Sequence, residues 1–502
     1  MDSSIVILAC VSLYMVFCIA IGIWAMKRTK NTEDFFMAGR NLGVMITGIA
    51  IFSSIMSGFG FVGGPGLVYK MGISSFWILI STPIGFCLAF FLAAKRLRIL
   101  AEKTNAISLP DIAEARFQSK FVRLFTAIAV LAGVVAYMAV QIKAMAVVLR
   151  DIWNQLCESQ QLQMTQDGLL VFVVVSSAVL VFYCVTGGII ASVYTDFFQG
   201  IIMVTAAVLI FIAAAMAVDG GFAGMAETMY RDDPESIRPW GSLGIIACLS
   251  WHFIFAFGVV GQPHIVTKMM MSKRVEDARG ALPLTLLGYT LAALLWIGIG
   301  LSMRTMVLQG TIADLETSNS AAAIFLQQKV PAILAGIVFA ALFAAIMSTA
   351  DGFLNIGAAA LVHDIPRSFT RRGEPKNELL LARLATVVLA VASSVFAMSF
   401  PDKLIGMLGV FGWGVFAASL APLVGFGLNW KQASSTAAIV SILAGLFINT
   451  LDVMYKMAGG TLPYGISGGT IALLVSSTLF VGISLFSKPQ VLSPDVEEAM
   501  NA

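Results

Sequence analysis

The chain has 502 residues, of which 59% are hydrophobic and only 12% are charged, and its formal net charge is +3. Soluble globular domains are closer to a quarter charged, so this composition excludes a secreted domain, a fibrous chain and a disordered one. Runs of 18 or more apolar residues recur along the chain, which is typical of membrane-spanning helices. No Walker sequence, nucleophile elbow or HExxH metal motif occurs, so we expect no enzymatic activity.

The apolar runs predict an all-α integral membrane protein with about thirteen transmembrane helices in a single transporter domain, residues 1–502. The first run has no basic residue before it, so we expect a retained leading helix rather than a signal peptide. The predicted spans are 4–26, 43–68, 73–94, 124–148, 168–190, 194–217, 243–267, 282–303, 331–357, 381–399, 404–427, 434–455 and 466–487.

The basic residues predict the orientation of these spans. With the N-terminus outside, the inner loops, the inner edge of the tenth span and the tail 488–502 hold 22 of the 31 lysines and arginines. This bias follows the positive-inside rule, so we expect a multi-pass protein of the inner or plasma membrane with a cytoplasmic C-terminus. The basic residues are scattered over several loops, which favours contact with anionic lipid of the bilayer and argues against nucleic acid as a partner.

Two spans carry matching clusters of glycine and proline. At an offset of 198 residues, Gly60, Gly63 and Pro65 align with Gly258, Gly261 and Pro263. Five spans separate the two clusters, so the halves enter the membrane from opposite sides. This predicts a five-plus-five inverted repeat, 43–217 and 243–427, with discontinuous second and seventh helices and two trailing helices over 434–487. Alternatively, the glycines only allow close helix packing.

Polar residues inside apolar spans are costly and usually functional. Asp196 and Asp351 lie at one predicted depth, and Ser348 is on the same helix face as Asp351. These groups suit a hard cation or a shared proton; otherwise each carboxylate snorkels or caps a helix. Lys143 either snorkels or pairs with an anionic substrate.

Several motifs occur in a specific order along the spans. They are Asp34-Phe35-Phe36-Met37-Ala38-Gly39-Arg40-Asn41-Leu42-Gly43, Met56-Ser57-Gly58, Gly187-Gly188, Thr195-Asp196 with Gln199, Gly261-Gln262-Pro263-His264, and Ala344-Ala345-Ile346-Met347-Ser348-Thr349. Together they resemble the sodium:solute symporter family, which includes proline, pantothenate and sugar carriers, from about residue 4 to 487. The resemblance implies the leucine-transporter fold and Na+ as the coupling ion.

The resemblance also implies the positions of the two ligands. The sodium ligands are the carbonyls of Ser53, Met56 and Ala345 and the hydroxyls of Ser348 and Thr349. The resemblance links Asp196 to ion coupling, and Asp351 is a second coupling candidate because it lies at the same predicted depth. The expected substrate-binding residues are Ser57, Gly58, Phe59, Gln141, Lys143, Phe255, Val259 and Gln262.

The substrate-binding positions differ from those of the proline carriers. That branch has an acidic residue where this chain has Ile55, and a tryptophan and a tyrosine where it has Phe255 and Val259. The second span and Gln141 are closer to the pantothenate carriers. Asp351 replaces a small polar residue and forms, as one alternative, a second cation or proton site.

The sequence therefore predicts a sodium-coupled secondary symporter, a monomer, that imports a small organic solute. A carboxylate or an amino-acid-like compound of pantothenate or proline type is expected. The alternatives are a proton-coupled symporter of the same fold, and a transporter-like membrane sensor that works with a separate kinase.

Overall fold

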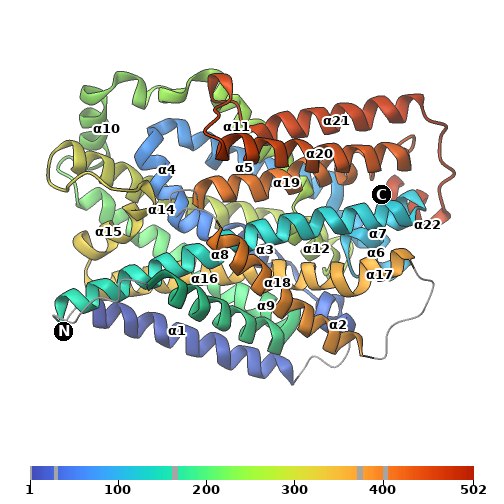
Figure 1. Ribbon diagram of the computed structural model, residues 1–502, viewed down its shortest axis with the longest axis horizontal. Helices are drawn as coiled ribbons and strands as arrows, with labels where there is room; N and C mark the ends of the chain where they lie inside the picture. The colour runs from blue at the N-terminus through green and yellow to red at the C-terminus, as the bar shows by residue number, and fades with distance from the viewer. Residues whose placement is uncertain (1–2, 28–31, 161–167, 370–376, 400–404) are drawn as a thin grey trace.

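A computed structural model of the protein describes residues 3–27, 32–160, 168–369, 377–399 and 405–502. Within these residues the chain is almost entirely helical, and the extended contact recorded there is one isolated bridge between Leu42 and Ser272. The helices lie side by side in an elongated bundle (Figure 1). The predicted all-α class is confirmed.

The helices vary widely in length, and several short ones join or interrupt the long ones. In chain order they are α1 (Ser3–Met26), α2 (Thr32–Met37), η1 (Ala38–Arg40), α3 (Val44–Ile55), η2 (Phe59–Gly63), α4 (Gly64–Met71), η3 (Gly72–Ser75), α5 (Phe76–Ala89), η4 (Phe90–Ala94), α6 (Lys95–Thr104), α7 (Leu109–Phe117), α8 (Lys120–Ser159), α9 (Gly168–Met216), α10 (Gly221–Asp232), η5 (Pro234–Ile237), η6 (Gly241–Leu243), α11 (Gly244–Gly258), η7 (Val259–Gly261), α12 (Pro263–Met270), α13 (Asp277–Gly280), α14 (Leu282–Leu308), η8 (Ser318–Ser320), α15 (Ala321–Lys329), α16 (Ala332–Ala359), η9 (Ala360–Asp364), α17 (Ile365–Phe369), α18 (Glu378–Met398), α19 (Ile405–Gly425), α20 (Ser435–Met457), η11 (Pro463–Gly465), α21 (Gly468–Phe486) and α22 (Pro494–Asn501).

Eleven helical segments of the described chain are long and apolar enough to cross a membrane, and Val44–Ile55 and Leu169–Phe182 are shorter apolar helices. The protein is therefore a multi-pass membrane protein. The predicted number of thirteen spans is not confirmed, because the predicted ranges 43–68 and 168–190 are each matched by one of these shorter helices and not by a long apolar segment of their own.

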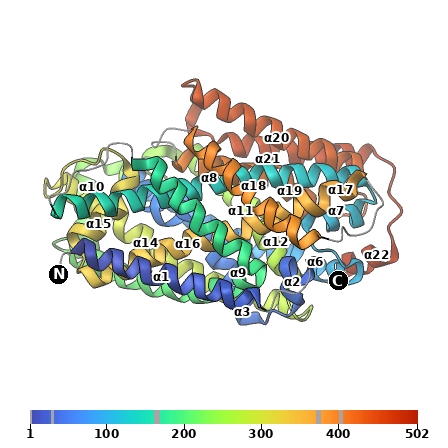
Figure 2. The same cartoon turned by 60° about the horizontal axis from the view of Figure 1, so that its bottom comes forward.

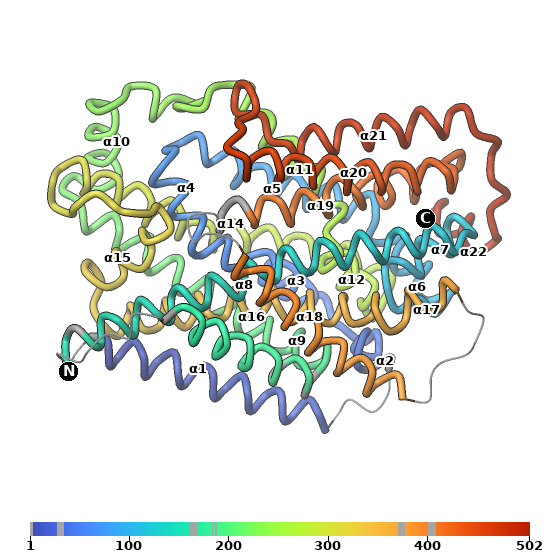
Figure 3. Tube along the Cα trace, viewed as in Figure 1, coloured from blue at the N-terminus to red at the C-terminus, as the bar shows by residue number. Residues whose placement is uncertain are grey.

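The bundle has two distinct ends (Figures 1 and 3). The α7 end carries α6, α7, α17 and α22, and the α10 end carries α10, α15 and the start of α1. The chain thus starts and finishes at opposite ends, as an odd number of crossings requires. The side of the membrane that each end faces stays a prediction.

The second predicted span is interrupted, but not at its glycines. The helix stops at Ile55, Met56 and Ser57 are not helical, and the chain resumes helical geometry at Gly58. The glycines that follow serve close packing: a Cβ on Gly64 would lie 2.1 Å from Cδ2 of Trp296. The break was therefore predicted in the correct span but a few residues too late.

The seventh predicted span is also interrupted. Here α11 and η7 end at Gly261, Gln262 is extended with φ −75° and ψ 110°, and α12 starts at Pro263. A Cβ on Gly261 would lie 2.5 Å from the Ala421 backbone nitrogen of α19. Both alternatives for the glycines thus hold, since each cluster borders a break and also allows close packing.

The chain reverses within α9 at Gly188, which has φ 57° and ψ −156°. Glycine adopts this geometry readily, and a Cβ there would lie 2.6 Å from the ring of Phe35. The inner connection expected over 191–193 is wrong, because those residues are helical.

The last two long helices cover one side of the bundle. Figure 2 shows α20 and α21 on the side away from α1, where both pack against α19. This placement is compatible with trailing helices added to a ten-helix repeat, and the repeat boundaries themselves stay a prediction.

Candidate functional site

The break after α3 is held open by two side chains of α8. The backbone N–H of Gly58 donates to Oε1 of Gln141 at 2.8 Å, and Ser57 Oγ lies 3.2 Å from the Tyr137 hydroxyl. Tyr137 and Gln141 are one helical turn apart, so they face the same side of α8. They satisfy polar groups that the interrupted helix would leave without partners. Of the predicted substrate residues, Ser57, Gly58 and Gln141 thus meet here.

Lys143 points elsewhere. It is 1% exposed, and its Nζ lies 3.4 Å from the carbonyl oxygen of Ala397 in α18. Two residues along a helix face nearly opposite sides, so Lys143 and Gln141 cannot contact the same small solute. We therefore do not carry Lys143 into the proposed substrate site.

Oxygen atoms gather where α16 passes the end of α3. Ser348 Oγ donates to the carbonyls of Ser53 and Ala345, each at 3.0 Å, and Thr349 Oγ1 donates to Ala345 at 3.0 Å and to the Ser54 carbonyl at 2.9 Å. All are buried. Four of the five predicted sodium ligands therefore lie together, and Ser54 joins them.

Met56, the fifth predicted ligand, closes the end of α3. It is 1% exposed, with φ −74° and ψ 84°, and its side chain lines a central cavity beside the oxygen cluster. The last carbonyls of a helix carry partial negative charge. An ion at the cluster would therefore sit at the favourable end of α3.

The central cavity has a volume of about 20 Å³, which is room for about one water molecule. Its lining is largely aromatic and contains no charged side chain. The lining residues are Ile55, Met56, Phe59, Ile78, Thr82, Tyr137, Phe255, Tyr289, Trp296 and Trp413.

Aromatic rings cover this cavity. Phe59 stacks on Phe255 with ring centroids 6.5 Å apart, and Phe255 in turn contacts Trp413 and Trp251. Trp251 also lines a larger cavity of about 560 Å³ between α4, α11, α19 and residues 456–467. The Phe59–Phe255 pair therefore separates the central cavity from a wide vestibule.

The other two predicted substrate residues flank the second break. Gln262 Nε2 donates to the carbonyls of Gly258 and Trp413 at 3.3 and 3.4 Å. Val259 packs on α5 instead, where a Cβ on Gly85 would lie 2.4 Å from its side chain. Gln262 is thus placed near the cavity wall, whereas Val259 fills a helix interface.

Access to the center differs between the two ends of the bundle. Besides the vestibule, cavities of about 510 and 390 Å³ lie around residues 316–320. Between α7, α12 and α16 there is a cavity of only about 10 Å³. The three wide cavities thus lie toward one end of the bundle, whereas the cavity beside α7 has room for no more than about one water molecule.

Asp196 forms a fully buried ion pair that the sequence did not indicate. Lys268 Nζ in α12 lies 2.7 Å from Asp196 Oδ2 and 3.0 Å from the carbonyl of Ala50 in α3. The Asp196 side chain is 0% exposed and the Lys268 side chain is 2% exposed. Asp196 lies inside α9, so neither snorkelling nor helix capping describes it.

Asp351 lies on the same side of α9. Its Oδ1 accepts from Ser192 Oγ at 2.7 Å, and its backbone carbonyl accepts from Asn355 Nδ2 at 2.9 Å. Ser192 and Asp196 are one turn apart on α9. Asp196 and the hydrogen-bond partner of Asp351 therefore lie on one face of that helix. Their roles in coupling stay predictions.

Lys268 was missed because it lies at the end of an apolar span, where it was assigned to an inner loop. A partner for Asp196 could have been expected from the sequence, because a carboxylate buried in a membrane requires a cationic or hydrogen-bonding partner. Lys268 is close to the predicted depth of Asp196.

Comparison with known proteins agrees with the motifs. The model of the sodium:solute symporter family matches residues 35–445. The high-affinity proline transporter PutP of Bacillus subtilis is 31% identical over 88% of this chain and 92% of that protein. The osmoregulated proline transporter OpuE of the same organism is 27% identical over 97% of this chain and 96% of that protein.

A solved structure shares the fold. The substrate-bound, outward-open state of a Na+-coupled sialic acid symporter has a TM-score of 0.75 at 20% identity and covers 97% of this chain and 99% of that one. The predicted fold class is thereby confirmed, and the relatives agree with the prediction of a transporter rather than an enzyme. With the family model covering most of its length, the chain belongs to the sodium:solute symporter family.

Proposed function

We propose that this chain imports a small zwitterionic amino acid, with proline as the first candidate, in symport with Na+ held by the oxygen cluster between α3 and α16. The observation that carries the proposal is the contact of this cluster with an uncharged aromatic cavity through Met56. Relatives named as proline transporters support the solute class.

The charge of the cavity restricts the solute. An unpaired charge in a site without countercharges is strongly disfavoured, and the lining residues carry none. A zwitterion has no net charge, and the ends of the broken helices carry partial charges that can partner its carboxylate and its ammonium group. The start of α12 attracts a carboxylate, and the carbonyls at the end of α3 attract an ammonium group or Na+.

Sodium suits the oxygen cluster for a similar reason. Ser53, Ser54, Ala345, Ser348 and Thr349 offer neutral oxygens, and a hard cation prefers oxygen ligands. In the structure the hydroxyls donate to the carbonyls. On ion binding, each hydroxyl would rotate its hydrogen away and offer a lone pair, so α3 and α16 would be joined through the ion.

The departures from the proline carriers fall on the cavity itself. Ile55 and Phe255 both line it, whereas the resemblance places an acidic residue and a tryptophan there. The pocket of this chain is therefore more apolar at these two points. Pantothenate and the longer aliphatic amino acids belong in the competition panel.

The ion gradient supplies enough energy for uptake. One charge moving through 100 mV provides about 2.3 kcal/mol, and a tenfold sodium gradient adds about 1.4 kcal/mol. Together they support roughly 500-fold accumulation of a neutral solute at one Na+ per solute.

The test is uptake of labelled proline into proteoliposomes, with and without an inward sodium gradient. Thr349→Ala removes the hydroxyl that reaches Ser54, and we expect the half-saturating sodium concentration to rise about tenfold, the equivalent of one hydrogen-bonding ligand of about 1.4 kcal/mol. Thr386→Ala is the matched control, because Thr386 is buried in α18 and donates within its own helix to Ala382.

Three results would each contradict a part of the proposal. Uptake that persists without sodium and collapses with a pH gradient would favour proton coupling. Uptake of none of the panel would remove the solute class. An unchanged sodium dependence in Thr349→Ala would refute the ion site while leaving the solute class in place.

A further inference from the structure

A cluster of charged side chains at the α7 end takes no part in the proposed transport site. It joins α7, the start of α8, η9 and the start of α18. Its members are Asp111, Glu114, Arg123, His363, Asp364 and Glu378. Asp364, His363 and Glu378 are at most 3% exposed, and Arg123 is 6% exposed.

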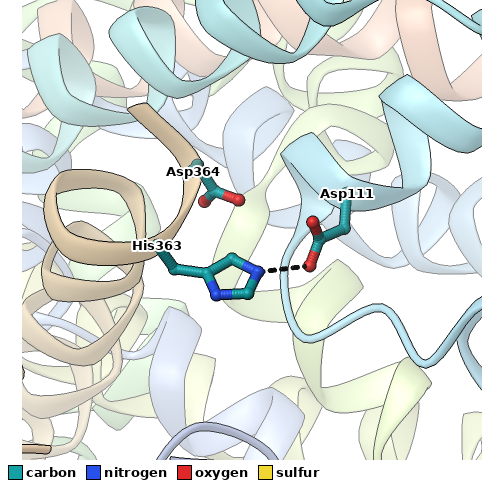
Figure 4. Close-up of side chains that lie close together, drawn as sticks. All are labelled: Asp111, His363 and Asp364. Atoms are coloured by element: carbon teal, nitrogen blue, oxygen red, sulfur yellow. Dashed lines mark hydrogen bonds and ion pairs between the residues drawn. The ribbon is translucent and has the colours of Figure 1, made fainter. Parts of the chain in front are cut away.

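His363 is held between two carboxylates. Its Nε2 lies 3.0 Å from Asp111 Oδ2 (Figure 4), and its Nδ1 lies 3.0 Å from Glu378 Oε1. A histidine that ligates a metal through one ring nitrogen usually donates the other N–H to a carboxylate, which fixes its tautomer and orientation. Glu378 is placed for that orienting role, and Nε2 faces Asp111.

Both aspartates have partners on Oδ1, and Asp111 Oδ2 also accepts from the backbone N–H of Ile107 at 3.0 Å. Arg123 contacts Oδ1 of both: it forms an ion pair with Asp111, and its Nε lies 3.6 Å from Asp364. Ser108 Oγ also donates to Oδ1 of Asp364 at 2.7 Å. These partners orient both carboxylates beside His363, with Oδ2 of Asp111 3.0 Å from its Nε2.

Two buried oxygens of the cluster have no hydrogen-bond partner among the described residues, Oδ2 of Asp364 and Oε2 of Glu378. Buried carboxylate oxygens without partners are costly. The four carboxylates also outnumber the one arginine of the cluster, Arg123. Both observations favour binding of a cation at this position.

We propose that Asp111, His363 and Asp364 form a binding site for a divalent transition-metal ion of the zinc class. One oxygen of each aspartate and one ring nitrogen of His363 lie within 4.8 Å of one another. Two ligands of a tetrahedral zinc ion are about 3.4 Å apart, so closure of the site requires movement of roughly 1 Å. The fourth position is left to water.

The ligand chemistry selects the metal. Ca²⁺ takes six to eight oxygen ligands and Mg²⁺ keeps an octahedral oxygen shell, whereas one imidazole with two carboxylates suits zinc or a neighbouring first-row ion. The two residues from η9 follow each other in a π-helical turn, a local distortion frequent at functional sites. A bound ion would therefore connect α7 with the end of α16.

The test is direct metal binding to the purified full-length protein in detergent. It is prepared without a polyhistidine tag, stripped with a chelator and titrated with Co²⁺ as the optical probe. We expect one equivalent to give the visible absorption bands of four-coordinate Co²⁺, which Zn²⁺ then displaces. Zn²⁺ should also raise the thermal unfolding midpoint in a concentration-dependent way.

The variants locate the site. His363→Gln and Asp364→Asn should weaken Co²⁺ binding at least 100-fold, and Glu378→Gln should weaken it 10–100-fold through loss of the orienting carboxylate. His252→Gln is the control, because His252 binds Ser81 in a different part of the bundle and its loss should leave Co²⁺ affinity unchanged.

The outcomes separate cleanly. Absence of saturable one-to-one binding in the wild-type protein overturns the proposal, and so does full affinity in His363→Gln or an equal loss in His252→Gln. If one ligand variant fails to fold, the other ligand variant and Glu378→Gln still decide the matter. None of these measurements depends on the transported solute, so the proposal stands or falls separately from the proposed function.

Discussion

The buried pair of Lys268 and Asp196 gives the sharpest quantitative prediction. Lys268→Met leaves Asp196 as a carboxylate without its cation at 0% exposure, and Asp196→Asn leaves the ammonium group with only the Ala50 carbonyl. Removing one partner of a buried ion pair costs about 3–5 kcal/mol. The double variant, Lys268→Met with Asp196→Asn, removes both charges and should recover most of that loss.

The expected loss converts to a measurable temperature shift. Unfolding entropy is about 2.1 cal/mol/K per residue, so a chain of 502 residues loses about 1 °C in midpoint for each kcal/mol. Each single variant should therefore unfold roughly 3–5 °C below the wild type in detergent, followed by intrinsic fluorescence. The coupling energy between the two changes should reach several kcal/mol.

An exposed ion pair of similar length is the control. Lys431 and Glu497 are 2.9 Å apart, with side chains 52% and 55% exposed. Exposed pairs contribute at most about 1 kcal/mol, so Lys431→Met and Glu497→Gln should each shift the midpoint by less than about 1 °C. Single variants at Lys268 and Asp196 that match these controls, or a double variant as unstable as the sum of the singles, would refute the reasoning.

Three further changes test other contacts. Gly64→Ala should destabilise the protein by about 1–3 kcal/mol in thermal unfolding and lower uptake, because the added Cβ overlaps the Trp296 ring. Gly482→Ala is the control and should behave as wild type, because its Cβ meets nothing within 4 Å. Gln141→Leu leaves the Gly58 N–H without its acceptor, so we expect the free energy of unfolding in the same assay to fall by about 1–3 kcal/mol. Gln118→Leu, at the surface, is the control and should have near-normal stability. Asp351→Asn should raise the half-saturating sodium concentration roughly tenfold, since an amide attracts a cation less than a carboxylate does, and an unchanged sodium dependence would remove Asp351 from coupling.

The sequence predicted the features that depend on composition and order. Apolar runs predicted the membrane class, and the aligned glycines located both interrupted helices, because a glycine or proline cluster in an apolar span has few structural uses. The serine and threonine of α16 were placed opposite α3 by motif alone, and the structure brings Ser348 and Thr349 within 3.0 Å of carbonyls there.

Side-chain direction is what the sequence could not supply. Gln141 and Lys143 are two residues apart and both were named as substrate-binding candidates, yet one contacts the break and the other contacts α18. Val259 faces α5 rather than the cavity for the same reason. The pairing of Lys268 with Asp196 joins residues 72 positions apart, and no local pattern contains it.

The contacts of α3 connect the proposed ion site to the second broken span. Lys268 Nζ binds the carbonyl of Ala50, and Ser348 Oγ binds that of Ser53, three residues farther along the same helix face. The start of α3 is also tied to the end of α12, since Leu42 N–H donates to Met271 at 3.2 Å and Lys273 N–H donates to Leu42 at 2.8 Å. The half-helices α3 and α12 are therefore joined at two points by buried or backbone contacts.

This double connection restricts how the closed α7 end can open. A motion that separates α3 from α12 would break the hydrogen bond from Lys268 to the Ala50 carbonyl and the backbone bridge together, at a cost of roughly a few kcal/mol. A motion that carries the two half-helices as one unit keeps both and changes instead their contacts with α16. The hydroxyls of Ser348 and Thr349 lie at that boundary, so an ion bound there would stabilise the closed arrangement and its release would favour opening.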